Sequence, residues 1–239
     1  MLVRAARGAG LLVLALAAGC QSLVPPTTLD VPYTQEQVWA VAPFANESGV
    51  SIVDPFRFAD SFMIEATQVD GITMLPVNRV IYAMRTLEMA DIRTVNDAMS
   101  VMNLLDLDGL VVGSVTVYEP YRPLKLGIAV QLYTRAGGNT WDGQHVRDLA
   151  DSPVGDTWGG ATAGRPVAQS GNVFDSSNHQ TLLDLAEYTA GRSEPDSAYG
   201  SDLYLVSMDV YARFVCYRLL ADLLAQERAQ LMPVADASP

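Results

Sequence analysis

The sequence predicts an α/β domain in which a mixed β-sheet is flanked by helices. Three observations lead to this fold class. Apolar segments with strand character alternate with segments of helical periodicity in the order β-α-β-α-α-β-β over residues 37–133. A long, polar, Gly-rich insertion follows at about 134–172, and a long C-terminal helix ends near Met232. One domain over residues 37–232 therefore accounts for most of the chain, and residues 233–239 are expected to fray.

The N-terminus has the layout of a lipoprotein leader. Arg4 and Arg7 stand ahead of an apolar run over residues 11–18, which is shorter than the roughly 20 apolar residues that a membrane-spanning helix needs. The run ends in Ala17-Ala18-Gly19-Cys20, which resembles the lipobox of bacterial lipoproteins. We therefore predict a signal peptide over residues 1–19 and lipid attachment at Cys20, with two or more acyl chains for stable anchoring. An ordinary secretory signal peptide with an unrelated cysteine is the alternative.

The residues around the cysteine indicate where the protein is delivered. The lipobox usually carries Leu three residues before the cysteine, whereas here Leu16 lies one place further back and Ala17 takes that position. Gln21 follows the cysteine, where the resemblance implies the outer membrane, with the domain in the periplasm. Residues 20–36 are rich in proline and small polar residues, so they are predicted to be a lipidated tether that spaces the domain off the membrane.

Composition excludes one class of partner. The chain has 15 Lys and Arg against 27 Asp and Glu, a net charge of −12. Removing Arg4 and Arg7 with the leader leaves 13 against 27, a net charge of −14. Nucleic-acid binding depends largely on Lys and Arg that neutralise phosphates, so no nucleic acid is expected. With Cys20 committed to lipid, Cys216 has no intrachain partner and is interpreted as an inert core thiol.

The first half of the domain supplies two strands and one helix. The nearly continuous apolar run over residues 38–44 predicts a buried strand, and turn-forming residues follow it. Asp54 and Pro55 have the residue types of a helix N-cap and first helical position, and the helix is closed by Gly71. A short second strand is predicted over residues 72–75.

Two capped helices and a hairpin come next. Asn78 and Thr94 are the predicted caps, and Asp97 lies in the first turn of the second of these helices, where a carboxylate suits the helix dipole. The β-rich runs over residues 110–118 and 126–133 are separated by a short turn, which predicts a hairpin.

The remaining elements are helical apart from one short strand. That strand is predicted near residues 171–174, at the end of the insertion. Residues 175–177 are predicted to be the cap cluster of a following helix, and a closing helix is expected over residues 208–232. One apolar face is predicted for this closing helix, carrying Tyr211, Val215, Leu219 and Leu223.

Two of these segments resemble a known family. The run over residues 38–49 reads Val-Trp-Ala-Val-Ala-Pro-Phe-Ala-Asn-Glu-Ser-Gly and is similar to the opening strand and turn of the TolB N-terminal-like superfamily. Residues 107–115, Leu-Asp-Gly-Leu-Val-Val-Gly-Ser-Val, are similar to its later Gly-containing strand. The superfamily includes lipoproteins of the curli secretion channel type and lipoprotein activators of penicillin-binding proteins. The resemblance covers about residues 37–133 and implies the mixed-sheet fold and a role through protein contacts, without catalytic residues.

Several residues have the type needed for a catalytic or metal site, but each has a simpler interpretation. Gly159 to Gly164 have the glycine spacing of a P-loop but lack its Lys and Ser/Thr, so a loop is expected. His145 and His179 are the only histidines and have no cluster of further ligands, while Asp106 and Asp108 are interpreted as a loop pair. No nucleophile elbow is present. The sequence therefore predicts no enzyme, no cofactor and no metal, and an envelope hydrolase is the minor alternative.

Tyr118, Tyr121 and Tyr133 flank the predicted hairpin and could form an aromatic interaction patch, although tyrosine is also common in strands. The leading hypothesis is a membrane-anchored envelope lipoprotein that acts as a non-enzymatic accessory or assembly factor through an unidentified protein partner. A ring- or pore-forming subunit of a secretion or transport system is the alternative, and a homo-oligomer stays open. The polar insertion lacks the alternation of membrane-spanning strands, which disfavours a pore.

Overall fold

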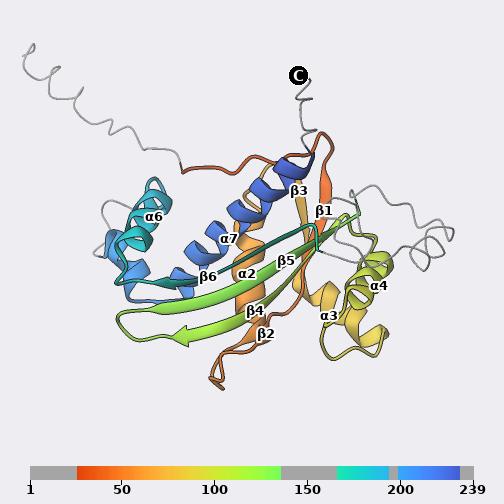
Figure 1. The fold of residues 1–239 in the computed structure, drawn as a ribbon, viewed down its shortest axis with the longest axis horizontal. Helices are drawn as coiled ribbons and strands as arrows, with labels where there is room; N and C mark the ends of the chain where they lie inside the picture. The colour runs from red at the N-terminus through yellow and green to blue at the C-terminus, as the bar shows by residue number, and fades with distance from the viewer. Residues whose placement is uncertain (1–25, 136–165, 194–198, 232–239) are drawn as a thin grey trace, which may run out of the picture.

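A mixed six-stranded sheet organises the protein, as predicted (Figure 1). The computed structural model describes residues 26–135, 166–193 and 199–231. The strand order is β3-β1-β4-β5-β6, and β2 also pairs with β4. Pairing is parallel between β1 and β3, β1 and β4, and β2 and β4, and antiparallel in β4–β5 and β5–β6. The strands are β1 Gln37–Val41, β2 Ala45–Asn46, β3 Ile72–Leu75, β4 Gly109–Glu119, β5 Lys125–Thr134 and β6 Ala168–Asp175.

Helices cover the sheet on both faces, but not over its whole width. The larger core cluster joins one face to α2 and α7, and α6 and the short 3-10 helix η1 pack beside α7. The smaller cluster joins the other face to α3 and α4 near β1 and the start of β4. The protein therefore has three layers at that end and two layers at β5 and β6. The helices are α2 Pro55–Ala66, α3 Val77–Thr86, α4 Val95–Leu105, α6 His179–Thr189, η1 Gly200–Leu205 and α7 Met208–Leu231.

The first predicted strand is divided in two. β1 ends at Val41, and β2 resumes at Ala45 beside Ser114 of β4. Pro43 lies between them and has no N–H to donate to a ladder. The N–H of the next residue, Phe44, instead donates to the carbonyl of Pro55 at the start of α2.

Local signals placed two of the predicted helix caps correctly. The Asp54 carboxylate accepts the N–H of Phe56 at the start of α2. Thr94 and Asp97 form a complete capping box at the start of α4.

Two other predicted caps are wrong. α3 already begins at Val77, directly after Pro76, so Asn78 is inside its first turn and makes no cap. α6 is capped by Asn178, whose side chain accepts the N–H groups of Gln180 and Thr181. The preceding Asp175 forms a separate turn by accepting the N–H of Ser177.

The capping box at Thr94 predicts a pH dependence of stability. Hydrogen bonds from the N–H groups of Thr94 and Arg93 and from the Thr94 hydroxyl hold the pKa of Asp97 below its ordinary value of 3.8. Because the folded pKa lies below the unfolded one, the stabilisation is complete above about pH 4 and is lost as the pH falls through the folded pKa. We expect Asp97→Asn to remove this acid-sensitive part in unfolding measurements between pH 2.5 and 6. Thr94→Ala should cost about 0.5–2 kcal/mol near neutral pH, and an unchanged pH profile in Asp97→Asn would contradict the assignment.

The glycines of the second family-like segment lie under aromatic rings. A Cβ at Gly109 would lie 2.6 Å from the Trp39 ring, and one at Gly113 would lie 2.7 Å from the Phe44 ring. Trp39 and Phe44 belong to the first family-like segment, and both are buried. The two segments that resemble the family are therefore the two halves of one packing arrangement between β1, β2 and β4.

The strand expected at the end of the insertion is longer than predicted. β6 covers Ala168–Asp175, so it begins inside the stretch interpreted as polar loop. Its outer edge is partly covered, because the side-chain amide of Gln226 on α7 pairs with both the N–H and the carbonyl of Gln169. The rest of the predicted insertion, residues 136–165, lies outside the described residues, as do the leader and the C-terminal tail.

The closing helix buries more than the single predicted face. The four predicted residues are buried, but so are Phe214, Cys216 and Leu220 on other sides of the helix. The reason is that α7 packs between β5 and β6, α2 and η1 instead of lying on the surface. Across the described residues, no helix is both long and apolar enough to cross a membrane.

Candidate functional site

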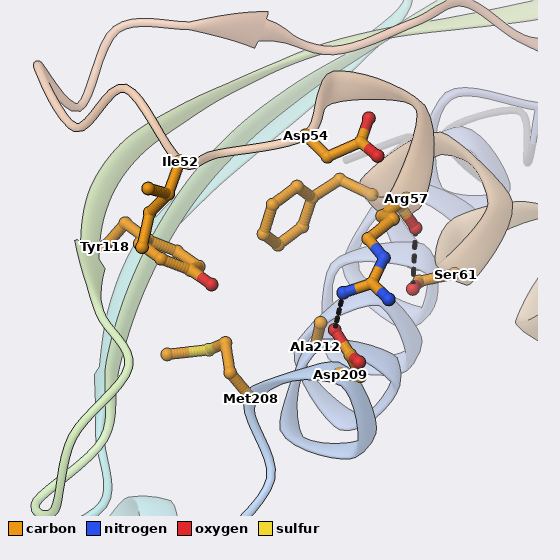
Figure 2. Close-up of a pocket in the computed structure, with 9 residues that line it drawn as sticks. Ile52, Asp54, Arg57, Ser61, Tyr118, Met208, Asp209 and Ala212 are labelled. Atoms are coloured by element: carbon orange, nitrogen blue, oxygen red, sulfur yellow. Dashed lines mark hydrogen bonds and ion pairs between the residues drawn. The ribbon is translucent and has the colours of Figure 1, made fainter.

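A pocket of about 380 Å³ opens beside the β4–β5 hairpin (Figure 2). Three chain segments that are distant in the sequence form its walls: the loop before α2 with the first turns of α2, the end of β4, and the start of α7. The lining residues are Ile52, Asp54, Arg57, Phe58, Ser61, Tyr118, Met208, Asp209 and Ala212.

One wall of the pocket is aromatic and apolar. The ring of Tyr118 packs edge-on against Phe58 of α2, with ring centroids 6.1 Å apart and an interplanar angle of 89°. Burial raises the pKa of the Tyr118 hydroxyl, and the Asp209 carboxylate adds to the shift. The tyrosine is therefore a neutral hydrogen-bonding group at neutral pH. Ile52, which is exposed, and Met208, which is only 7% exposed, also line the pocket (Figure 2).

The opposite wall is polar. The Arg57 guanidinium donates to the Asp209 carboxylate at 2.9 Å, and this ion pair joins α2 to the start of α7. Both side chains are more than 60% exposed, so the pair contributes little to stability. The Ser61 hydroxyl donates to the Arg57 carbonyl at 2.8 Å (Figure 2). The pocket thus combines an apolar wall with a charged wall that is open to solvent.

Exposed apolar side chains extend the site beyond the pocket. Ile52 is 67% exposed and Tyr121, in the hairpin turn, is 83% exposed. The same turn is tied to the chain before α7, because Arg122 Nε donates to the Leu205 carbonyl at 2.9 Å. We call the surface formed by Ile52, Tyr118, Tyr121 and Met208 the hairpin-end patch.

The structure corrects the predicted tyrosine patch. Tyr118 pairs with Leu126 near the hairpin turn, whereas Tyr133 pairs with Leu110 at the other end of the two strands. Tyr133 is 7% exposed, packs in the smaller core cluster and donates its hydroxyl to Gln131. Tyr118 and Tyr121 are thus brought together, and Tyr133 is a core residue. The predicted strands over residues 110–118 and 126–133 already imply this separation, whereas the burial of Tyr133 depends on its packing in the smaller core cluster.

The other members of the hairpin-end patch were missed by the sequence analysis. Ile52 and Met208 are about 150 residues apart in the chain and meet only because α2 and α7 pack side by side. No local motif marks either residue, and an exposed isoleucine in a loop carries no signal by itself.

The remaining candidate groups do not assemble into a catalytic arrangement within the described residues. The Asp106 carboxylate pairs with Arg135 at 2.7 Å, whereas that of Asp108 accepts the Val38 N–H, so the two aspartates face different partners. Cys216 is fully buried, and burial raises the pKa of its thiol, as expected for an inert core cysteine. In the same residues, no group of three or more His, Cys, Asp or Glu side chains could hold a metal ion. His145, Cys20 and the predicted loop at 159–164 lie outside them.

A wider groove of about 1060 Å³ lies on the sheet face that α3 and α4 leave partly open. Its walls come from the β1–β2 turn, the start of α2 and the α3–α4 connection, and Ser114 and Gln131 lie in its floor. The groove holds no tyrosine, so it is not the predicted aromatic surface.

Comparison with known proteins gives similarity at the level of structure. No protein-family model and no curated protein sequence matches the chain. Among solved structures, the LpoB C-terminal domain from Salmonella enterica is similar over 45% of this chain and 78% of its own, with 14% identity and a TM-score of 0.36. Lipoprotein GNA1162 from Neisseria meningitidis is similar over 63% and 90%, with 13% identity and a TM-score of 0.38. The PelC dodecamer from Paraburkholderia phytofirmans is similar over 84% and 93%, with 8% identity and a TM-score of 0.35.

One of these structures is named as a lipoprotein. Identities of 8–14% and TM-scores below 0.4 do not show a shared function.

Proposed function

We propose that the protein is a membrane-anchored envelope lipoprotein that acts as a non-enzymatic accessory or assembly factor, and that it binds another envelope protein through the hairpin-end patch. The observation that carries this proposal is the exposure of Ile52 and Tyr121 around a pocket that is already walled by Tyr118 and Met208. The anchor is proposed from the lipobox-like sequence that ends at Cys20, and delivery to the outer membrane from Gln21.

The chemistry of the patch suits a protein partner. Tyrosine, methionine and arginine are enriched at protein interfaces, and binding energy concentrates where an aromatic anchor fills a pocket inside a polar rim. The patch has this arrangement: Tyr118 and Met208 border a concavity, and the Arg57–Asp209 ion pair forms part of its rim. A partner that inserts one apolar side chain into the pocket would cover Tyr118 and Ile52 and leave the ion pair at the solvent boundary.

Site-specific crosslinking in cells tests this role. A photoreactive phenylalanine analogue at position 121 is expected to capture a distinct envelope protein, because the native Tyr121 side chain is mostly exposed. The double variant Tyr118→Ala/Ile52→Ala, crosslinked from the same position, should lower the yield at least tenfold, as expected when about 2 kcal/mol or more of hot-spot binding is lost. The matched control is Tyr82→Ala, which removes a 68% exposed tyrosine from α3.

The possible outcomes separate the proposed partner from a self-association. A crosslinked product formed only with a second copy of this chain would replace the accessory role with a ring or other homo-oligomer. Capture that is equally strong in the double variant and in Tyr82→Ala would remove the patch from the proposal. Cys20→Ser tests the anchor separately, because the protein should then leave the membrane fraction while the purified domain keeps its unfolding free energy.

A further inference from the structure

The segment expected to act as a free spacer is docked on the body of the protein. Residues 26–36 run along one edge of the molecule, across the C-terminal part of α7, before they enter β1 (Figure 1). Contacts recur at every third residue. Arg192 Nη2 donates to the Thr27 carbonyl at 2.8 Å, Arg228 Nη2 donates to the Asp30 carbonyl at 2.8 Å, and the Tyr33 ring lies within the body.

Apolar packing accompanies these polar contacts. Leu29, Val31 and Tyr33 all pack against the larger core cluster. Val31 lies so close to Gly71 that a Cβ there would be 2.9 Å from its Cγ2 atom. The Tyr33 ring meets Trp39 edge-on, with centroids 6.0 Å apart. Packing of these three alternate residues on the body requires an ordered backbone, which costs conformational entropy that burial of the apolar side chains offsets. A free spacer would not be ordered in this way.

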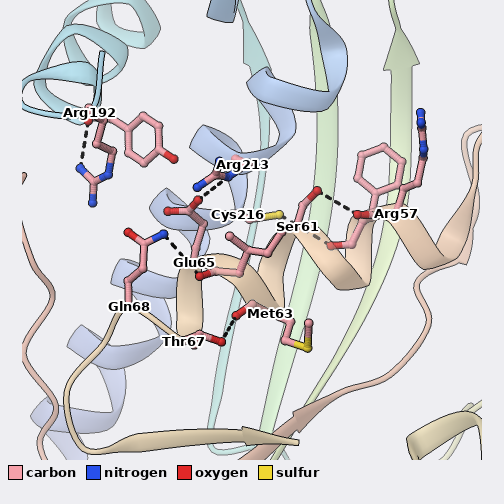
Figure 3. Close-up of polar contacts among 12 residues, drawn as sticks. Arg57, Ser61, Met63, Glu65, Thr67, Gln68, Arg192, Arg213 and Cys216 are labelled. Atoms are coloured by element: carbon pink, nitrogen blue, oxygen red, sulfur yellow. Dashed lines mark hydrogen bonds and ion pairs between the residues drawn. The ribbon is translucent and has the colours of Figure 1, made fainter. Parts of the chain in front are cut away.

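Arg192, which binds the segment at Thr27, is itself held by contacts within the body. The Arg192 guanidinium is stacked over the rings of Tyr188 and Tyr217, with its central carbon 4.4 and 4.9 Å from their centroids (Figure 3 shows the arginine). Its Nη1 donates to the Tyr188 carbonyl, which leaves Nη2 for Thr27. The arginine is therefore fixed before the segment docks, and little side-chain entropy is lost in the contact.

A buried carboxyl group lies at the other end of the segment. Glu227 of α7 is 2% exposed, and burial raises its pKa although the Tyr33 hydroxyl counteracts the shift. Burial, and then the Glu227 carboxylate, raise the pKa of Tyr33 in turn. The segment is thus held at Thr27 and Asp30 by arginines of the turn after α6 and of α7, and at Tyr33 by packing against Trp39 and the larger core cluster.

We infer that residues 27–33 are a strap that docks on the body and so shortens the lipid tether. The edge of the protein along which the strap runs is thereby turned toward the bilayer. This orientation rests on the proposed anchor at Cys20. If residues 20–36 were all free, they would span up to about 60 Å at roughly 3.3–3.6 Å per residue. With the strap docked, only residues 20–26 are available, which span at most about 25 Å.

The strap also sets the direction of the hairpin-end patch. In Figure 1 the strap follows the upper edge of the molecule, whereas the β4–β5 hairpin and the loop before α2 lie toward the opposite edge. A short tether at the upper edge therefore holds the body near the membrane and presents the patch away from it, where a periplasmic partner can reach it.

The first part of the test needs no lipid. In the mature chain with Cys20→Ser, a nitroxide label on Thr28→Cys reports the mobility of the strap, because Thr28 is exposed and Cys216 is buried. We expect a restricted spectrum and an at least threefold rise of the mobile component in Arg228→Gln and, independently, in Val31→Ser. Arg93→Gln is the matched control, since Arg93 pairs with Asp91 in the α3–α4 connection. A label that is already fully mobile in the parent protein would overturn the strap.

The second part measures orientation on the lipidated full-length product in phosphatidylethanolamine–phosphatidylglycerol vesicles. A donor dye is placed on Asp70→Cys, next to the strap contact at Gly71, or on Tyr121→Cys at the opposite edge, with acceptors on lipid headgroups. Energy transfer should be at least twofold greater from position 70, and Arg228→Gln should reduce the difference. Equal transfer from the two positions would overturn the orientation. Failure of the protein to bind vesicles would count against the anchor, while the nitroxide spectrum would still decide the strap.

Discussion

Replacing Arg213 with methionine is expected to lower the free energy of unfolding by about 3–5 kcal/mol, because it leaves a buried carboxylate without its partner. Arg213 Nε of α7 donates to the Glu65 carboxylate of α2 at 2.8 Å (Figure 3). The Glu65 side chain is 1% exposed, so water cannot replace the guanidinium. The pair joins the last turn of α2 to α7.

The two halves of this ion pair should respond unequally. The Arg213 side chain is 37% exposed, so it can be hydrated when its partner is removed. Burial by itself would lower the pKa of Arg213, but the charge and hydrogen bond of Glu65, together with Tyr188 and Tyr204, outweigh that effect and the net shift is upward. Glu65→Gln keeps the volume and one hydrogen-bond acceptor, and we therefore expect it to cost only about 1–2 kcal/mol.

Urea unfolding followed by circular dichroism measures both variants. Arg57→Met is the matched control, because it breaks the exposed ion pair with Asp209 and should cost less than about 1 kcal/mol. The double variant Glu65→Leu/Arg213→Met should recover much of the stability lost in Arg213→Met, since no unpaired charge stays buried. If Arg213→Met were no more destabilising than Arg57→Met, the buried pair would not be a stabilising feature of the α2–α7 contact.

The second large effect concerns the contact between Trp39 and Gly109. Trp39 is fully buried, and its removal in Trp39→Ala should cost about 3–5 kcal/mol through lost transfer energy and the cavity left behind. Gly109→Ala acts in the opposite sense, because the added methyl group would lie 2.6 Å from the indole ring and must displace it. Such overpacking is expected to cost about 1–3 kcal/mol.

Gly171→Ala is the control for a strand glycine without an aromatic neighbour. The three nearest atoms to a Cβ there would be the Ala129 methyl group at 3.3 Å, Ala129 Cα at 3.5 Å and the Ile128 carbonyl oxygen at 3.8 Å, none of them aromatic, so the stability should change by less than about 0.5 kcal/mol. In a double-mutant cycle, Trp39→Leu should relieve at least 1 kcal/mol of the cost of Gly109→Ala, as expected for two residues in contact. Equal effects of the two glycine substitutions would mean that the ring does not restrict position 109.

The outcome of the helix-cap predictions shows which local signals suffice. Asp54 and Thr94 cap helices as expected, because each accepts N–H groups that lie two or three residues away. Asn78 fails because the chain already becomes helical directly after Pro76, whose fixed φ suits entry into a helix. Pro76 therefore sets the start of α3. Asn78 lies inside the first turn and not ahead of it, so its side chain is not in the N-cap position.

The sequence by itself determined the fold class, the strand and helix order, and the expectation of a lipid anchor at Cys20. Hydrophobic periodicity and turn residues act over a few neighbours, so they can be interpreted without knowledge of the rest of the chain. The mixed sheet, the β4–β5 hairpin and the long α7 follow from such signals, and the structure confirms them.

Only the tertiary structure decided which side chains meet. Tyr133 has the same residue type and strand context as Tyr118, yet Tyr133 packs in the core cluster with α3 and α4 whereas Tyr118 lies beside a pocket. Ile52 joins the pocket because α2 packs against α7. Residues 27–33 form a strap because Arg192 and Arg228, which are distant in the sequence, donate to the carbonyls of Thr27 and Asp30. Contacts of this kind depend on the register and packing of whole elements, which no local pattern of residues specifies.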